Sequence, residues 1–96
     1  MFAVMRDYYS CGDFDELRTL AEDELLPALR ALPGFQRFML FETDEGHIIS
    51  MSLFATAKQA EAADWKESEI VFDRLREVLP QHAQTLISAM VIDSER

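Results

Sequence analysis

Trp65 is the residue whose type and position point most directly to a binding site. It is the only tryptophan of the chain, and its neighbours Asp64, Lys66 and Glu67 are polar, so they do not account for a large ring at this position. A tryptophan can anchor a core or a subunit interface, or it can line a cavity and hold a flat ligand. The sequence leaves both interpretations open.

The first expected strand, over residues 2–9, offers polar side chains that could accompany this ring. Side chains alternate between the two faces of a strand, so one face carries Arg6 with Tyr8 and the other carries Asp7 with Tyr9. The sequence does not decide which pair faces a cavity.

Two serines add to this set. Ser50 and Ser52 share one face of an otherwise apolar strand expected over residues 47–55. A mostly apolar cavity with a few placed polar groups is typical of ligand sites. Small residues that pack against a helix would give the same pattern.

Other classes of site find little support. The sequence has no zinc-ligand spacing, no phosphate-binding glycine loop and no nucleophile elbow, and its three glycines all fall in expected turns. His47 and His82 lack a cysteine or a second histidine at ligand spacing, so we expect two solvated surface residues. Cys11 is the only cysteine and cannot form an internal disulfide, so we expect an ordinary loop thiol.

Composition indicates one small acidic domain over residues 1–96. The chain has 18 acidic and 9 basic side chains, a formal charge of −9, and its 49% hydrophobic content excludes disorder. No segment gathers Lys and Arg into a stripe, so neither nucleic acid nor an anionic membrane is an expected partner. Charges interrupt every apolar run before the roughly 18 residues of a membrane span. The first residues do not resemble a secretory signal, so we expect a cytoplasmic protein.

Hydrophobic periodicity and turn residues predict strand, helix, two strands, helix and strand. These elements span residues 2–9, 13–32, 35–43, 47–55, 57–79 and 86–93. Pro27 should subdivide the first helix near residues 23–26. Thr56 with Gln59, and Asp64 with Glu67, have the spacing of capping boxes, which predicts two helical pieces that meet near Trp65. The glycine of Asp44-Glu45-Gly46 predicts a bulge-type hairpin turn.

This order is that of a ferredoxin-like α+β fold, βαββαβ, with both helices on one face of a four-stranded antiparallel sheet. Large apolar side chains occur on both faces of the expected strands, as Met39 and Leu40 illustrate. Two helices can cover only one face, and monomers rarely expose a large apolar patch. The pattern therefore predicts a homodimer in which the second faces enclose a semi-apolar space.

Three segments carry a resemblance to a known family. They are LPALRALPGF at 26–35, ISMSLF at 49–54 and AKQAEAADW at 57–65. Together with the element order, they resemble the antibiotic-biosynthesis-monooxygenase-like family of dimeric α/β barrels over nearly the whole chain. The resemblance implies the fold and the dimer. Family members include enzymes that oxidise hydroxylated polycyclic aromatics with O₂ and without metal or flavin, haem-degrading enzymes, and proteins without a known substrate.

The resemblance maps onto this chain in part. Trp65 resembles the cavity tryptophan of the family, and Glu61 stands where the quinone-forming members have an asparagine. The haem-degrading branch has an asparagine and a histidine in its site. This chain contains no asparagine, and Leu75 stands near the histidine position, so the resemblance does not favour haem degradation.

We therefore expect an oxidoreductase, a cofactor-independent monooxygenase without metal that acts on a small aromatic or polyketide-like molecule. Glu61 or Asp7 is the candidate base that removes a phenolic or activated C–H proton, and low polarity around it would raise its pKa. Trp65 with Tyr8 or Tyr9 would hold the flat substrate. The alternative is a non-catalytic dimeric module of the same fold that binds a small apolar ligand or a partner.

Overall fold

The structure is a computed structural model that describes residues 1–8, 13–79, 84–89 and 94. Its strands are β1 (Phe2–Tyr8), β2 (Phe35–Glu42), β3 (Ile48–Phe54) and β4 (Gln84–Ala89). Its helical segments are α1 (Phe14–Leu20), η1 (Ala21–Leu25), α2 (Leu26–Arg30), α3 (Ala57–Ile70) and η2 (Val71–Leu75). The four strands form one antiparallel sheet in the order β2-β3-β1-β4, which confirms the ferredoxin-like arrangement.

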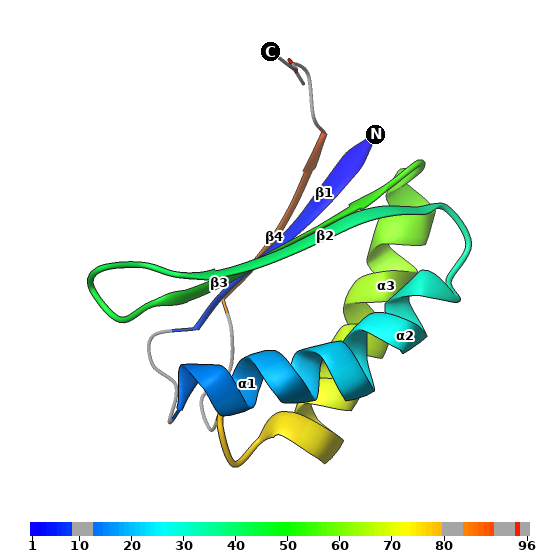
Figure 1. Cartoon of the computed structure of the whole chain (residues 1–96). Helices are drawn as coiled ribbons and strands as arrows, with labels where there is room; N and C mark the ends of the chain where they lie inside the picture. The colour runs from blue at the N-terminus through cyan, green and yellow to red at the C-terminus, as the bar shows by residue number, and fades with distance from the viewer. Residues whose placement is uncertain (9–12, 80–83, 90–93, 95–96) are drawn as a thin grey trace.

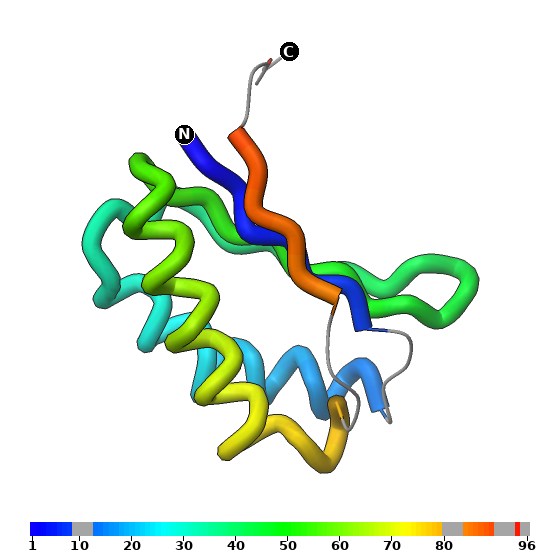
Figure 2. The backbone as a smooth tube through the Cα atoms, turned by 180° about the vertical axis from the view of Figure 1, so that it is seen from behind, coloured from blue at the N-terminus to red at the C-terminus, as the bar shows by residue number. Residues whose placement is uncertain are grey.

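All helical segments lie on the same side of the sheet in both views (Figures 1 and 2). The sheet face beneath them carries Val4, Arg6 and Tyr8 of β1, because Arg6 contacts α3 and the other two join the buried core. The sequence leaves open which face of β1 points toward the helices, and the structure shows that it is the face of Arg6 and Tyr8. Asp7 lies on the opposite face of the sheet.

The first helix is divided where Pro27 requires it. Residues 21–25 form a π-helical segment, and Pro27 lies in the first turn of the α-helix that follows. A proline has no N–H to donate and its ring would clash with the carbonyl four residues earlier, at Asp23. A wider π turn relieves that clash, so the predicted subdivision is confirmed.

The predicted break near Trp65 is wrong. α3 runs without interruption from Ala57 to Ile70, and the irregular turn begins only at Val71. The Asp64 carboxylate does not cap a second helix, because its Oδ1 accepts a hydrogen bond from Arg6 on β1. The spacing of Asp64 and Glu67 reflects a shared helix face rather than a capping box.

The capping box at Thr56 is confirmed. Thr56 Oγ1 accepts from the Gln59 N–H at 3.2 Å, and Gln59 Oε1 accepts from the Thr56 N–H at 3.1 Å. Asp13 also caps its helix, because its carboxylate accepts from the N–H of Glu16. Both helices therefore start where the sequence places them.

The hairpin between β2 and β3 has the predicted bulge-type turn. The Gly46 N–H donates to the Thr43 carbonyl at 3.0 Å, and Gly46 has φ +85°. A type I turn followed by a left-handed residue is the common three-residue hairpin loop, and glycine takes that conformation without strain. β4 begins at Gln84, two residues before the predicted start, and residues 90–93 of the predicted strand lie outside the described residues.

The second face of the sheet has no helix over it. We call it the outer face, and its apolar side chains are Ala3, Met5, Met39, Phe41, Ile49, Met51, Leu53 and Leu86. Phe41 is 45% exposed and Leu86 is 59% exposed. The prediction that both faces of the sheet are apolar is thereby confirmed. None of the helices in the described residues is long and apolar enough to cross a membrane.

Candidate functional site

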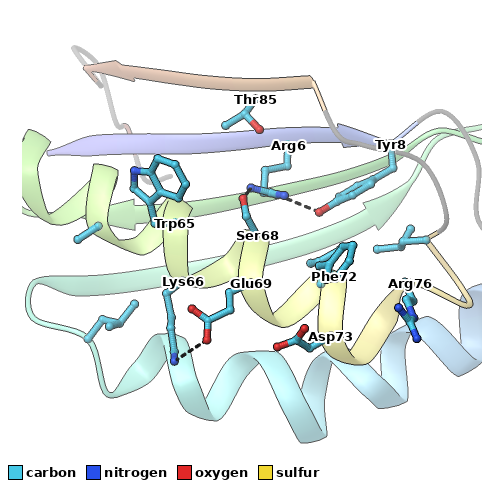
Figure 3. Close-up of a pocket in the computed structure, with 14 residues that line it drawn as sticks. Arg6, Tyr8, Trp65, Lys66, Ser68, Glu69, Phe72, Asp73, Arg76 and Thr85 are labelled. Carbon is cyan, nitrogen blue, oxygen red and sulfur yellow. Dashed lines mark hydrogen bonds and ion pairs between the residues drawn. The ribbon is translucent and has the colours of Figure 1, made fainter.

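A pocket of about 950 Å³ opens between α3 with η2 and the adjoining part of the sheet (Figure 3). This volume lies at the upper end of the range for small-molecule sites, about 300–1,000 Å³. Its lining residues are Arg6, Tyr8, Leu32, Ala62, Trp65, Lys66, Ser68, Glu69, Val71, Phe72, Asp73, Arg76, Leu79 and Thr85. It can therefore accept a molecule of several fused rings.

Two aromatic rings stand at the mouth of this pocket. Trp65 of α3 is 79% exposed and Phe72 of η2, which continues α3 directly, is 60% exposed, and both line the pocket. Their separation of seven residues is two helical turns, which places them on one side of the helix. The Arg76 guanidinium lies 5.7 Å from the centre of the Phe72 ring. Large apolar surfaces left this accessible mark an interaction site, for a small ligand or for another protein surface.

Arg6 forms the polar floor of the pocket. Its side chain lies among groups of α3 and of its own strand (Figure 3). Arg6 Nη1 lies 2.6 Å from Asp64 Oδ1 and 2.9 Å from Ser68 Oγ, and Arg6 Nε lies 2.8 Å from Glu67 Oε2 and 2.9 Å from Tyr8 Oη. Two carboxylates and two hydroxyls thus fix one guanidinium in place.

The local sequence explains why these groups meet. Asp64, Glu67 and Ser68 are spaced by three and four residues on α3, so they share the helix face that lies over the sheet. Arg6 and Tyr8 share one face of β1 because they are two residues apart. The Ser50 Oγ of β3, beside Arg6 in the sheet, donates to Glu67 Oε2 at 3.4 Å.

Burial determines the protonation of this cluster. Glu67 is only 2% exposed, and its burial raises the pKa of its carboxyl to about 7, although Arg6 opposes the shift. Burial likewise raises the pKa of Tyr8 to about 12, so its hydroxyl stays protonated at neutral pH. Burial lowers the pKa of Arg6, but Tyr8 and the two carboxylates more than compensate and leave a net increase.

Two hydrogen-bond donors of the cluster are open to a ligand. Among the residues that the structure describes, Arg6 Nη2 has no hydrogen-bond partner, and Tyr8 Oη is bonded only as an acceptor from Arg6. No buried side-chain nitrogen or oxygen of the described residues lacks a partner, so Nη2 is not fully buried, and Arg6 lines the pocket. The floor of the pocket therefore presents N–H groups and a neutral phenol O–H.

The structure brings some of the predicted site residues together. Trp65 and Tyr8 line the same pocket. Ser50 lies behind it, bonded to Glu67, and Ser52 is buried on the same face of the sheet. The reading of these serines as small residues beneath a helix fits both positions.

Other predicted residues lie away from this pocket. Asp7 is on the outer face, and Glu61 is an exposed residue of α3, one turn before Trp65 and not part of the pocket lining. Tyr9 lies outside the described residues. Among the described residues, neither the Asp7 nor the Glu61 side chain forms a hydrogen bond or ion pair with Arg6, so their role as base stays a prediction that activity measurements must test.

His47 differs from its prediction as a solvated surface residue. Its Nδ1 lies 3.1 Å from Asp7 Oδ1, and its side chain is only one third exposed. His82 and Cys11 lie outside the described residues. Within the part of the chain that the structure describes, no group of three His, Cys, Asp or Glu side chains could hold a metal ion.

Sequence reasoning missed Glu67, Ser68 and Phe72 as residues of this site. The sequence carries a signal for two of them, because Asp64, Glu67 and Ser68 stand at helical spacing. The same spacing also fits a capping box of Asp64 with Glu67. An arginine in a strand with apolar neighbours, such as Arg6, requires buried anionic partners, and that requirement would have pointed to this helix face.

Comparisons with known proteins identify the fold. No family model matches the chain, and no curated protein matches it. Among solved structures, a Nitrosomonas europaea protein proposed to be an antibiotic biosynthesis monooxygenase is 16% identical, with a TM-score of 0.71 over 96% of this chain and 100% of that one. A monooxygenase from the ActVA-Orf6 gene of Streptomyces coelicolor, in complex with nanaomycin D, is 14% identical, with a TM-score of 0.70 over 97% and 92%.

The same fold occurs beyond the monooxygenases. An uncharacterised NIPSNAP domain protein from Burkholderia xenovorans is 12% identical, with a TM-score of 0.66 over 100% of both chains. The chain thus has the fold of the antibiotic biosynthesis monooxygenases, as its resemblance to that family implies. Because these identities are low, they establish the fold and leave the activity to be argued from the site.

Proposed function

We propose that this protein is a cofactor-independent monooxygenase that oxidises a small hydroxylated aromatic molecule. The observation that carries the proposal is the pocket itself, in which Trp65 and Phe72 form an aromatic mouth above the polar floor of Arg6 and Tyr8. A flat ring would stack at the mouth while its oxygen substituent reaches the floor. Solved monooxygenases with the same fold support this assignment.

The chemistry requires the pocket to stabilise a deprotonated substrate. Loss of a phenolic or activated C–H proton leaves an electron-rich anion, and this anion can transfer electrons to O₂ without a metal or flavin. The N–H groups of Arg6 and the O–H of Tyr8 can stabilise the negative charge that develops on the substrate oxygen. Stacking on Trp65 would orient the ring and exclude water from it.

Oxygen uptake tests the proposal. The purified protein is incubated with an anthrone-type substrate in air-saturated buffer, and we expect O₂ consumption that falls at least tenfold in Trp65→Ala. Asp7→Asn and Glu61→Gln test the two predicted bases in the same assay. Oxygen uptake by the wild type that does not exceed buffer alone would refute the proposed activity.

A non-catalytic ligand-binding module is the second candidate. The wide exposure of Trp65 favours it, since an enzyme that handles reactive anions usually encloses its substrate. It predicts saturable quenching of Trp65 fluorescence by an aromatic ligand without oxygen uptake. Because the chain has one tryptophan, the signal reports on this pocket alone.

We also propose that two copies of the chain pair through their outer faces. The outer face carries the apolar side chains of Met5, Met39 and Met51 together with exposed Phe41 and Leu86. No element of the described residues covers this face. A two-fold axis would bury the same apolar surface of both copies. Light scattering should give the mass of two 11.0 kDa chains, and the mass of one chain at micromolar concentration would contradict the pairing.

A further inference from the structure

We propose that Arg6 binds the ionised hydroxyl of an aromatic ligand and that Glu67 takes up the proton which this hydroxyl loses. The inference deepens the proposed function and rests on its pocket, but it concerns equilibrium binding and requires no turnover. Glu67 acts here as a positioning and proton-accepting residue behind Arg6, because it does not itself line the pocket.

Arg6 is oriented for this role by the partners that it already has. Asp64 and Ser68 hold Nη1, while Glu67 and Tyr8 hold Nε, so the guanidinium cannot rotate without breaking several hydrogen bonds. The two N–H groups of Nη2 remain for a ligand. Tyr8 can donate its O–H to the same oxygen, so one ligand oxygen meets donors from two adjacent side chains of β1.

The charge of the cluster decides where the proton goes. The groups around Glu67 are Arg6 and Tyr8 of β1, Ser50 of β3 and Asp64 of α3, and Arg6 is the only cation among them. With both carboxyls ionised the cluster carries −1, so a bound oxyanion would bring it to −2 beside Arg6 and Glu67, which are 5% and 2% exposed. The charge stays at −1 if Glu67 becomes neutral as the ligand becomes an anion.

The proton transfer from the ligand hydroxyl to Glu67 requires no further reactant. The ligand O–H bond breaks, its oxygen keeps the electron pair, and a new O–H bond forms on the Glu67 carboxyl. Burial of Glu67, which brings its pKa to about 7, makes this carboxyl a much better proton acceptor than an exposed glutamate. The pocket should therefore select aromatic molecules with an ionisable hydroxyl over their methyl ethers.

Binding of 2-naphthol tests the inference, because its neutral and ionised forms absorb at different wavelengths. Titrations at pH 8 without oxygen use wild type, Glu67→Gln and, as the matched control, Glu77→Gln, whose side chain is exposed and outside the pocket. Calorimetry in two buffers of different ionisation enthalpy counts the protons that binding releases.

We expect the wild type and Glu77→Gln to bind the ionised form of 2-naphthol with almost no proton released to the buffer. Glu67→Gln should bind the same ionised form and release about one proton per ligand, because glutamine cannot accept it. The inference is overturned if the bound ligand shows the neutral spectrum, if wild type and Glu67→Gln release equal numbers of protons, or if 2-naphthol does not bind. Oxygen uptake with anthrone-type substrates reports separately on the proposed activity, so failure of the one can be told from failure of the other.

Discussion

The buried carboxyl of Glu67 should make the stability of this protein depend on pH near neutrality. Its side chain is 2% exposed, and its carboxyl lies between Arg6 and Ser50 on the side of α3 that faces the sheet. Glu67→Gln keeps the size and hydrogen-bonding capacity of the protonated carboxyl but cannot ionise. The variant therefore isolates the free-energy cost of the charge.

The sign of this pH dependence follows from the pKa of Glu67 in the folded and the unfolded states. Burial raises it from 4.5 to about 7 in the folded protein, so the folded state holds this proton more tightly than the unfolded chain. The stability that this tighter proton binding contributes is fully present below pH 4.5 and is lost as the pH rises through 7. Each pKa unit is worth about 1.4 kcal/mol, so the wild type should lose about 2 to 3 kcal/mol between pH 5 and pH 8 from this residue alone.

Denaturant unfolding at pH 5, 6, 7 and 8 measures the effect. We expect the free energy of unfolding of Glu67→Gln to rise relative to that of the wild type by about 2 to 3 kcal/mol across this range. Glu77→Gln, with an exposed side chain, should follow the wild type. Parallel curves for wild type and Glu67→Gln would show that the Arg6 ion pair offsets the burial of the carboxylate, which would refute the reasoning.

Three further experiments test the fold and its assembly. Gly34 has φ +79°, and a Cβ there would overlap the Gln59 side chain, whereas Gly46 has φ +85° and open space around it. Thermal unfolding should therefore show that Gly34→Ala is the more destabilising, with Gly46→Ala costing about 1 kcal/mol. Equal costs would contradict the packing argument. Thr56→Ala removes one half of the capping box and should cost about 1 kcal/mol in chemical unfolding, while Thr19→Ala on the exposed side of α1 should cost much less. Met51→Glu places a charge in the middle of the outer face and should lower the mass in light scattering from that of two chains to 11.0 kDa, and an unchanged dimer would exclude pairing through this face.

The elements of this fold follow from local signals in the sequence. Pro27 predicts a divided first helix because a missing N–H and a ring clash act within one turn. Thr56 with Gln59 marks the start of α3, and Gly46 marks the hairpin, for equally local reasons. Apolar residues on both parities of the strands predict a second apolar sheet face that no helix covers, and the structure shows one.

The site could be predicted only in part because its decisive contacts join segments about 60 residues apart. Whether Arg6 or Asp7 faces the helices depends on the sheet register, and periodicity alone cannot decide it when both faces are apolar. The pair Asp64 and Glu67 satisfies the spacing of a cap and equally the spacing of a helix face that binds a buried guanidinium. The second reading is correct because the oppositely charged partner is buried beneath this face, and an unpaired guanidinium there would cost more than a lost cap. A buried arginine in a strand is therefore the feature from which the search for a site in such a chain should begin.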